Sequence, residues 1–379
     1  MYQGQRQFYG LNLFRFPASI AIVIYHYPLV YMGAHPGIRY SIMSNIYSYA
    51  WLGVEVFFAI SGFLLYTHYS QKIRKYMGGG FTAFISGRVI RIYPVMVLTT
   101  VFTAVCLWLT VYFFPEGHLA SAGWATDAMH TTLVAFFLSV CGLQSGWISD
   151  RDHAAVYGAS WYLSVLMICS ILFYFILRYC KGKRLRENGC FIFLILFGAY
   201  LRINGGLAFP LMYSWCGRGY MGFFMGALVA QLITKVNADK QKQLLLLESV
   251  AAIFLYCVLL KIGCLGNLSV ATSLVLSPAL LILLTESKII SQISNNSIIT
   301  YLGNISFGIY LWHQPVIIWL YFFQDLFHWN INYESKYVFF NIILLTVIVA
   351  AATFALYERP ITRHWKMKLA EYNAINRRM

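Results

Sequence analysis

The segment Tyr337-Val-Phe-Phe-Asn-Ile-Ile-Leu-Leu-Thr-Val-Ile-Val-Ala-Ala-Ala-Thr-Phe-Ala-Leu-Tyr357 contains no charged side chain. A helix needs about 20 consecutive apolar residues to cross the hydrocarbon core of a bilayer, so this segment is long enough to span one. Comparable apolar stretches recur from Leu11 onward, separated by short polar connections. This pattern indicates an all-α fold, a polytopic bundle of membrane helices, and not the alternating strands of a membrane β-barrel.

The composition of the chain supports a membrane location. Of its 379 residues, 60% are hydrophobic and only 11% are charged, whereas a soluble domain carries about 25% charged residues. The net charge of +15 could suggest nucleic-acid binding, but the basic residues cluster in loops between apolar segments, as the positive-inside rule predicts. The lipid bilayer is therefore the expected partner, and nucleic acid is not.

Ten apolar segments are long enough to be membrane spans. We predict them at 11–32, 47–69, 89–114, 160–178, 189–206, 211–234, 244–263, 268–285, 299–323 and 337–357. An even number places both termini on one side, and every basic cluster falls inside if that side is the cytoplasm. The apolar segment 131–143 is short for a span and would turn the basic loop 178–186 outward, so we place it outside, as an interfacial or re-entrant segment. The predicted N- and C-termini are thus cytoplasmic.

Ionisable side chains within the predicted spans are site candidates, because they are expensive in a bilayer. Arg15 and His26 lie eleven residues apart on the first span, which places them on one face and about 16 Å apart along the axis. Glu55 on the second span lies at roughly the depth of His26, where a carboxylate could hold the histidine as a general base. A structural pair that ties two helices together is the alternative interpretation.

Further candidates lie on other spans. Arg88 and Arg91, at the cytoplasmic end of the third span, have the i, i+3 spacing of a phosphate-binding fork, although the positive-inside rule explains them equally well. His313 falls near the middle of the membrane, where a functional role is favoured. Glu358 closes the last span, where it could pair as a structural salt bridge with Arg15 or with either arginine of the third span.

Two aromatic and two basic residues belong to the outer half of the bundle. Trp161 and Tyr162 open the fourth span, and we interpret them as an aromatic belt in preference to a sugar platform. For Arg202 and Arg218 we favour snorkelling of the charged groups to the membrane interface over contact with an anionic acceptor.

No metal site is expected, because the eight cysteines have no Cys-x-x-Cys pair or other metal-ligand spacing.

Six short motifs occur in order along nearly the whole chain and together resemble the acyltransferase-3 family of integral membrane acyltransferases. They are Arg15-x10-His26, Gly53-Val-Glu-Val-Phe-Phe-Ala-Ile-Ser-Gly-Phe63, Arg88-x-x-Arg91 before Tyr93-Pro94, Ser160-Trp-Tyr-Leu-Ser164, Ser306-Phe-Gly-Ile-Tyr-Leu-Trp-His-Gln-Pro315 and Glu358-Arg-Pro360. On this resemblance, residues 1–365 form the transmembrane acyltransferase domain and 366–379 a short basic cytoplasmic tail. The chain departs from many relatives at Leu166-Met167, where they carry a glutamate, so no acid is assigned there.

The resemblance implies a bacterial inner-membrane enzyme that transfers an acyl group, usually acetyl from cytoplasmic acetyl-CoA, to a hydroxyl of a carbohydrate. Such acceptors are often lipid-linked or envelope glycans, for example O-antigen, capsule or exopolysaccharide. By analogy His26 is the catalytic histidine, Arg15 its motif partner, and Arg88 and Arg91 belong to the donor side. Ser61 and Tyr310 are further candidates within the motifs. Acetyl-CoA would be a co-substrate, and no tightly bound cofactor is implied.

Two other functions remain compatible with the same residues. The buried charges could form the pathway of a membrane transporter that exports a glycan or lipid-linked sugar. Alternatively, the protein could be a different type of membrane acyltransferase, in which His313 and not His26 is essential.

Overall fold

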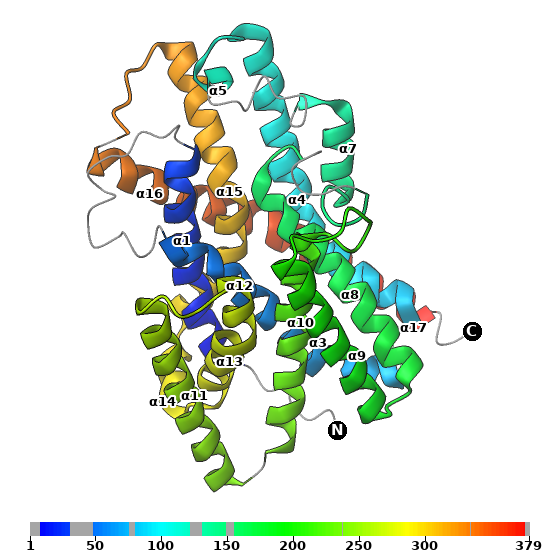
Figure 1. Cartoon of the computed structure of the whole chain (residues 1–379). Helices are drawn as coiled ribbons and strands as arrows, with labels where there is room; N and C mark the ends of the chain where they lie inside the picture. The colour runs from blue at the N-terminus through cyan, green and yellow to red at the C-terminus, as the bar shows by residue number, and fades with distance from the viewer. Residues whose placement is uncertain are drawn as a thin grey trace.

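The computed structural model describes residues 8–30, 48–75, 80–121, 131–148, 155–236, 238–333 and 335–375. This part of the chain is a bundle of helices (Figure 1). Its only β pairing is an isolated bridge between Gly206 and Tyr213. The predicted all-α fold is confirmed.

The main helices follow the predicted apolar segments closely. They are α1 (Gly10–Val30), α3 (Gly53–Arg74), α4 (Gly80–Phe113), α8 (Trp161–Cys180), α9 (Arg184–Ile203), α10 (Ser214–Lys235), α11 (Asp239–Lys261), α13 (Ser277–Glu286), α15 (Ser297–Phe327), α16 (Lys336–Thr353) and α17 (Arg359–Ile375). Shorter elements are the 3₁₀ turns η2 (Ala50–Leu52) and η4 (Gly158–Ser160) and the helices α5 (His118–Ser121), α7 (Leu133–Cys141), α12 (Leu268–Ala271) and α14 (Lys288–Ser294). Two π-helical segments join α12 to α13 and α16 to α17, at Thr272–Leu276 and Phe354–Glu358.

Six helices in the described ranges are both long and apolar enough to cross a membrane. They are Ala50–Arg74, Gly80–Phe113, Gly158–Cys180, Asp239–Lys261, Leu268–Glu286 and Lys336–Glu371. Helices α1, α9, α10 and α15 coincide with the other four predicted spans and have 21, 20, 22 and 31 residues, but they are not among these six. The predicted count of ten spans is therefore supported for six of them by length and hydropathy together.

Two predicted segments are refined by the structure. Within 131–143, helix α7 has nine residues, about 14 Å of helix, which is too short to cross a bilayer. The predicted tail does not begin at a break, since α17 continues through residue 365 to Ile375. Residues 376–379 lie outside the described part, and the predicted cytoplasmic location of both termini stays a prediction.

Helices α3 and α10 approach each other closely through glycines. A Cβ at Gly62 of α3 would collide with the backbone carbonyl of Phe223, and a Cβ at Gly226 of α10 would collide with that of Ala59. Small residues permit such close backbone contact between membrane helices. This pair forms the centre of one half of the bundle, with α8 and α9 packed beside it.

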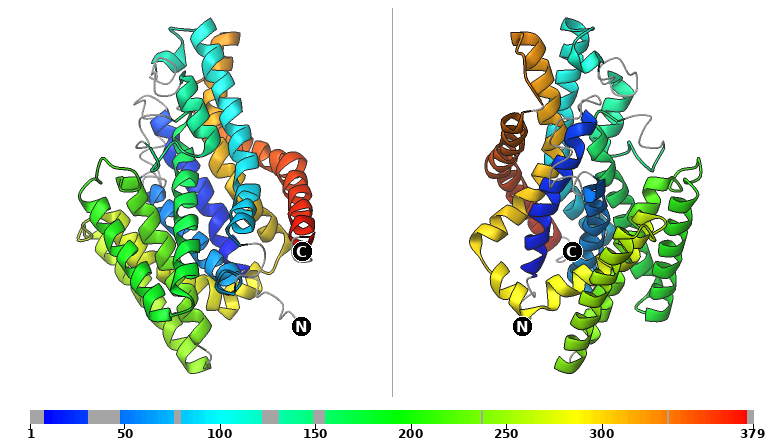
Figure 2. Two further views of the ribbon diagram at one scale, coloured as in Figure 1. Left: turned by 90° about the vertical axis from the view of Figure 1, so that its right-hand side faces the viewer. Right: turned by 60° about the vertical axis from the view of Figure 1, so that its left-hand side comes forward.

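The other half is built on α15. Helix α1 lies along α15, and α4 and α16 also pack on it; Figure 2 shows α1 and α15 side by side in a second orientation. Because α1 also contacts α3 and η2, it connects the two halves. Residues from α1, α3, α4, α8 and α15 therefore meet in the middle of the molecule.

We predict that Gly226→Ala destabilises the protein because the added methyl group would force α3 and α10 apart. Overpacking of this kind costs about 1–3 kcal/mol. The midpoint of thermal unfolding of detergent-purified protein measures the effect.

Gly189→Ala is the matched control. Gly189 lies in α9 and has no atom within 4 Å of the added methyl group, so alanine should be neutral or stabilising by about 0.5–1 kcal/mol through helix propensity. Equal unfolding midpoints for the two variants would contradict the proposed close packing at Gly226.

Candidate active site

A cavity of about 190 Å³ lies where α1, α3, α4, α8 and α15 meet. Its polar lining consists of Arg15, Ser61, Arg88, Arg91, Tyr162, Ser306 and Tyr310. Five of the predicted site residues, separated by up to 295 positions in the sequence, thus face one space. Tyr162, which we predicted with Trp161 to form an aromatic belt, is instead buried and lines this cavity. Ser306 had not been singled out, although it lies within a motif that carried the family resemblance.

One of the three arginines in the cavity has a carboxylate partner. Arg91 Nη1 donates to Glu358 Oε1 over 2.5 Å, and the Glu358 side chain is 1% exposed whereas that of Arg91 is 33% exposed. Glu358 belongs to the π-helical segment that joins α16 to α17. Arg91 is therefore the one of the three predicted arginine partners to which Glu358 is bonded.

The other two arginines form no salt bridge with a carboxylate of the described residues. The salt bridges of the described residues leave out both Arg15 and Arg88, and Arg88 Nε is buried without a hydrogen-bond partner. Their guanidinium groups face the cavity together with Arg91. The cavity therefore carries an excess of positive charge and planar donor groups, a combination suited to phosphate or carboxylate.

His26 and His313 lie against each other, although 287 residues separate them in the sequence. Their ring centroids are 4.8 Å apart. His26 Nδ1 lies 3.0 Å from the carbonyl oxygen of Ile22, and His313 Nδ1 lies 2.6 Å from that of Tyr310. The two histidines that the sequence offered as alternative catalytic residues therefore occupy one place, where α1 packs on α15.

Tyr310 connects the histidine pair to the arginine cavity. Its ring lines the cavity and also lies 5.9 Å from the ring of His313, 5.6 Å from Tyr162 and 6.4 Å from Phe57. Its hydroxyl donates to the backbone carbonyl of Ala159 over 2.9 Å, which holds the ring in place. Tyr310 thus adjoins both the arginine cavity and the pair of imidazoles.

The predicted pairing of Glu55 with His26 is corrected by the structure. Both carboxylate oxygens of Glu55 accept hydrogen bonds of 2.7 Å from Arg218, and Ser269 donates a third of 2.6 Å. Glu55 is fully buried and Arg218 is 4% exposed. Depth along α3 was a correct guide to the burial of Glu55, but it could not indicate which neighbouring helix supplies the partner.

Arg218 and Trp161 also differ from their predicted roles. The Arg218 guanidinium lies 4.8–5.3 Å from the ring centroids of three tryptophans: Trp51, Trp161 and Trp215. Trp161 is only 4% exposed. Hence Trp161 is not part of a lipid-facing belt, and Arg218 does not snorkel to the interface; both belong to a buried cluster around the ion pair.

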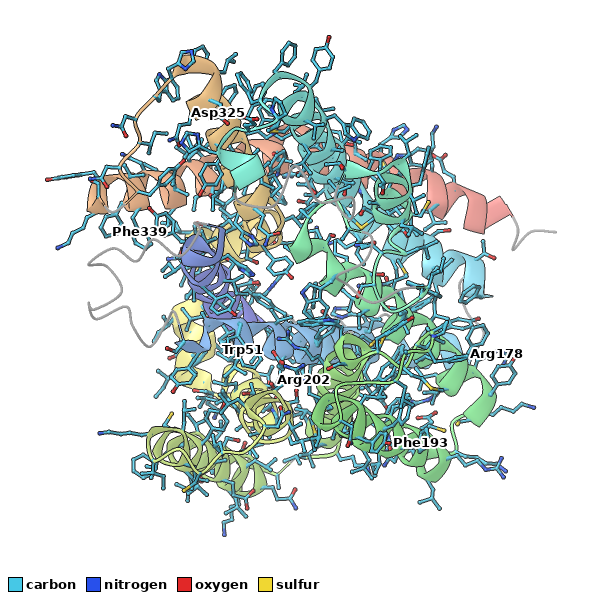
Figure 3. The ribbon with its side chains drawn as sticks, turned by 45° about the horizontal axis from the view of Figure 1, so that its top comes forward. Trp51, Arg178, Phe193, Arg202, Asp325 and Phe339 are labelled. Atoms are coloured by element: carbon cyan, nitrogen blue, oxygen red, sulfur yellow. The ribbon has the colours of Figure 1, made fainter. Side chains whose placement is uncertain are left out.

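Arg202 flanks this cluster next to Trp215. Its guanidinium lies 5.8 Å from the ring centroid of Trp215, and Nη1 donates to Ser214 Oγ over 3.0 Å. Figure 3 shows Arg202 and Trp51 near the middle of the molecule, carried by different elements.

Among the described residues, no group of three or more His, Cys, Asp or Glu side chains could hold a metal ion.

We predict that Glu55→Gln is strongly destabilising, because it leaves the buried Arg218 without a counter-charge. Breaking a buried pair in this way costs about 3–5 kcal/mol, whereas replacing both partners by apolar residues is often neutral. The double variant Glu55→Leu/Arg218→Met should therefore unfold at a higher temperature than Glu55→Gln. A double variant that is less stable than Glu55→Gln would contradict this account of the pair.

Comparison with known proteins agrees with this arrangement. Residues 8–357 match a family model described as an acyltransferase domain, of the acyltransferase-3 type. No curated protein and no solved structure matches the chain significantly. Because the family model covers nearly the whole sequence, including both histidines and all three arginines of the cavity, the chain belongs to the acyltransferase-3 family of integral membrane acyltransferases.

Proposed function

We propose that the protein is a membrane O-acyltransferase that moves an acyl group, by default acetyl, from cytoplasmic acyl-CoA to a hydroxyl of an envelope carbohydrate. O-antigen, capsule and exopolysaccharide are the acceptors that the family suggests. The observation that carries this proposal is the arginine cavity beside a pair of imidazoles. It offers an anion-binding group and a proton-accepting group at the two ends of one site.

The arginine cavity suits the donor. A CoA thioester carries phosphates, and arginines bind phosphate through paired, charge-assisted hydrogen bonds. Arg15 and Arg88 suit this role because neither forms a salt bridge within the described part of the chain. The 33% exposure of the Arg91 side chain gives the charged group a way to meet a ligand from outside the bundle.

His26 suits the chemical step. A carbonyl oxygen can only accept, so the contact with Ile22 assigns the hydrogen to Nδ1 and leaves the lone pair of the neutral ring on Nε2. In the proposed reaction Nε2 takes the proton of the acceptor hydroxyl, the oxygen attacks the thioester carbonyl, and the C–S bond breaks. The thiolate then receives the proton. Nε2 is also the reacting nitrogen if the histidine carries the acyl group briefly.

The proposed membrane arrangement separates the two substrates. Ten helices of about 20 residues or more would cross the bacterial inner membrane, with both termini in the cytoplasm, where the basic loops lie. Arg88 and Arg91 would then face the cytoplasmic donor, and His26 would lie in the outer half with access to an outer glycan. The six helices that satisfy length and hydropathy support this topology.

The first test is His26→Ala in purified protein. We expect the rate of acceptor-dependent CoA release from acetyl-CoA to fall at least 10²-fold, since general-base catalysis typically contributes about 10²–10⁴. Mass spectrometry of envelope glycans should show the loss of one acetyl unit in cells that carry the variant.

His68→Ala is the matched control for this test. His68 lies in α3, and its Nδ1 also contacts a carbonyl four residues earlier, that of Leu64 at 2.7 Å. Its replacement should leave turnover unchanged. Full activity of His26→Ala would refute the assigned role, and a wild-type protein that never consumes acetyl-CoA would favour the transporter.

The second test addresses donor binding. Arg88→Gln should raise the KM for acetyl-CoA about 10- to 100-fold, because a hydrogen bond to a charged group contributes about 1.5–3 kcal/mol. Arg184→Gln, which removes an exposed arginine at the start of α9, should leave KM unchanged. An unaltered KM in Arg88→Gln would remove this arginine from the donor site.

A further inference from the structure

We propose that His313 is the proton partner of His26: its Nε2 shares the proton that His26 removes from the acceptor hydroxyl. The inference deepens the proposed function and rests on it. Since His313 is completely buried, it cannot touch a substrate directly. It acts through the neighbouring imidazole and is therefore a positioning residue.

The hydrogen-bond pattern fixes the tautomer of His313. Its Nδ1 lies 2.6 Å from the carbonyl oxygen of Tyr310, and a carbonyl can only accept. Nδ1 therefore carries the hydrogen, and the lone pair of the neutral ring is on Nε2. By the same reasoning the contact with Ile22 places the lone pair of His26 on its own Nε2.

His313 Nε2 is an uncommitted base. It is buried and has no hydrogen-bond partner among the described residues. Buried polar atoms are almost always paired, so an unpaired acceptor at this depth calls for an explanation. A group that is paired only during the reaction would provide one.

The nearest titratable ring to this acceptor is His26. The ring centroids are 4.8 Å apart and the ring planes are tilted by 39°, so the imidazoles touch and a modest rotation would direct one nitrogen toward the other. Two other titratable rings of the described residues lie beside the pair, those of Tyr25, 4.9 Å from His26, and Tyr310, 5.9 Å from His313. Neither phenol is a base comparable with neutral imidazole.

Two buried carboxylates, on α3 and in the π-helical segment between α16 and α17, are already bonded to arginines. Glu55 is bonded to Arg218, and Glu358 to Arg91. These carboxylates are therefore not placed to stabilise a protonated His26 ring, whereas the His313 ring lies beside it and can do so.

The proton balance of the proposed step is complete. The hydroxyl proton moves to Nε2 of His26. The His26 ring then turns away from the acceptor oxygen, so that the N–H that results donates to Nε2 of His313. The new C–O bond forms as the C–S bond breaks, and the thiolate takes the shared proton to give the free CoA thiol. Both imidazoles return to their neutral forms with hydrogen on Nδ1.

His313→Asn separates this role from a structural one. The asparagine amide can still donate near the Nδ1 position toward the Tyr310 carbonyl, but the Nε2 base is gone. We expect kcat to fall about 100-fold, within the range for general-base catalysis, while the KM for acetyl-CoA stays unchanged. His68→Asn is the matched control and should leave kcat unaltered. Size-exclusion profiles and unfolding midpoints would confirm that both variants are folded.

A second variant tests whether basicity is what matters. His313→Gly opens space that added imidazole or pyrazole could fill; the two rings have the same shape, but pyrazole is a far weaker base. Rescue of turnover by imidazole alone supports proton sharing. Equal rescue by both rings, or a His313→Asn variant with wild-type kcat, would overturn the inference while leaving His26 and the proposed function in place. A wild-type protein without acceptor-dependent CoA release would instead overturn the proposed function.

Discussion

The ion pair between Glu55 and Arg218 is the constraint on which the rest of the structure depends. Both groups are buried, and an isolated charge in this environment would be prohibitively unfavourable, so α3 and α10 must meet where their side chains match. The glycines at 62 and 226 allow that approach along the same helix pair. Ser269 adds a hydrogen bond to Glu55 from α12. The face of α3 that remains, with Phe57 and Ser61, is thereby turned toward the arginine cavity.

Polar groups that are paired across helices in this bundle stabilise the fold, and they differ from the unpaired polar groups of the candidate site. Arg74 with Glu187, Arg91 with Glu358 and Arg218 with Glu55 are matched across helices. Two of the buried polar atoms that lack a hydrogen-bond partner among the described residues, Arg88 Nε and His313 Nε2, belong to the cavity and to the histidine pair that Tyr310 adjoins. Others lie elsewhere in the bundle, for example Gln231 Nε2 and Asn188 Oδ1. What distinguishes the two at Tyr310 is that a charged group and a base, both unsatisfied at a folding cost, lie close to one cavity.

Sequence patterns predicted the helices and most of the cavity, but they could not predict contacts between distant helices. Apolar length located ten segments that are helical in the structure, although not α17. The cost of burying charge identified Arg15 and His313, and the i, i+3 spacing identified Arg88 and Arg91. Periodicity along a helix gives depth and face, and it does not say which helix lies opposite. For this reason the partner of Glu55 was assigned wrongly. The contact of His26 with His313 also escaped detection, because it exists only through the packing of α1 on α15.

The spacing along α1 relates the two ends of the site. Arg15 and His26 are eleven residues apart, which is about 16 Å along the helix axis. Under the proposed function, a donor held by its phosphates near Arg15 would need a long flexible arm, like that of a CoA thioester, to bring its acyl carbon to His26. Tyr310 lines the cavity and neighbours His313, and its hydroxyl is tied to the backbone of η4 at Ala159. Its ring is therefore a described side chain that adjoins both parts of the proposed site.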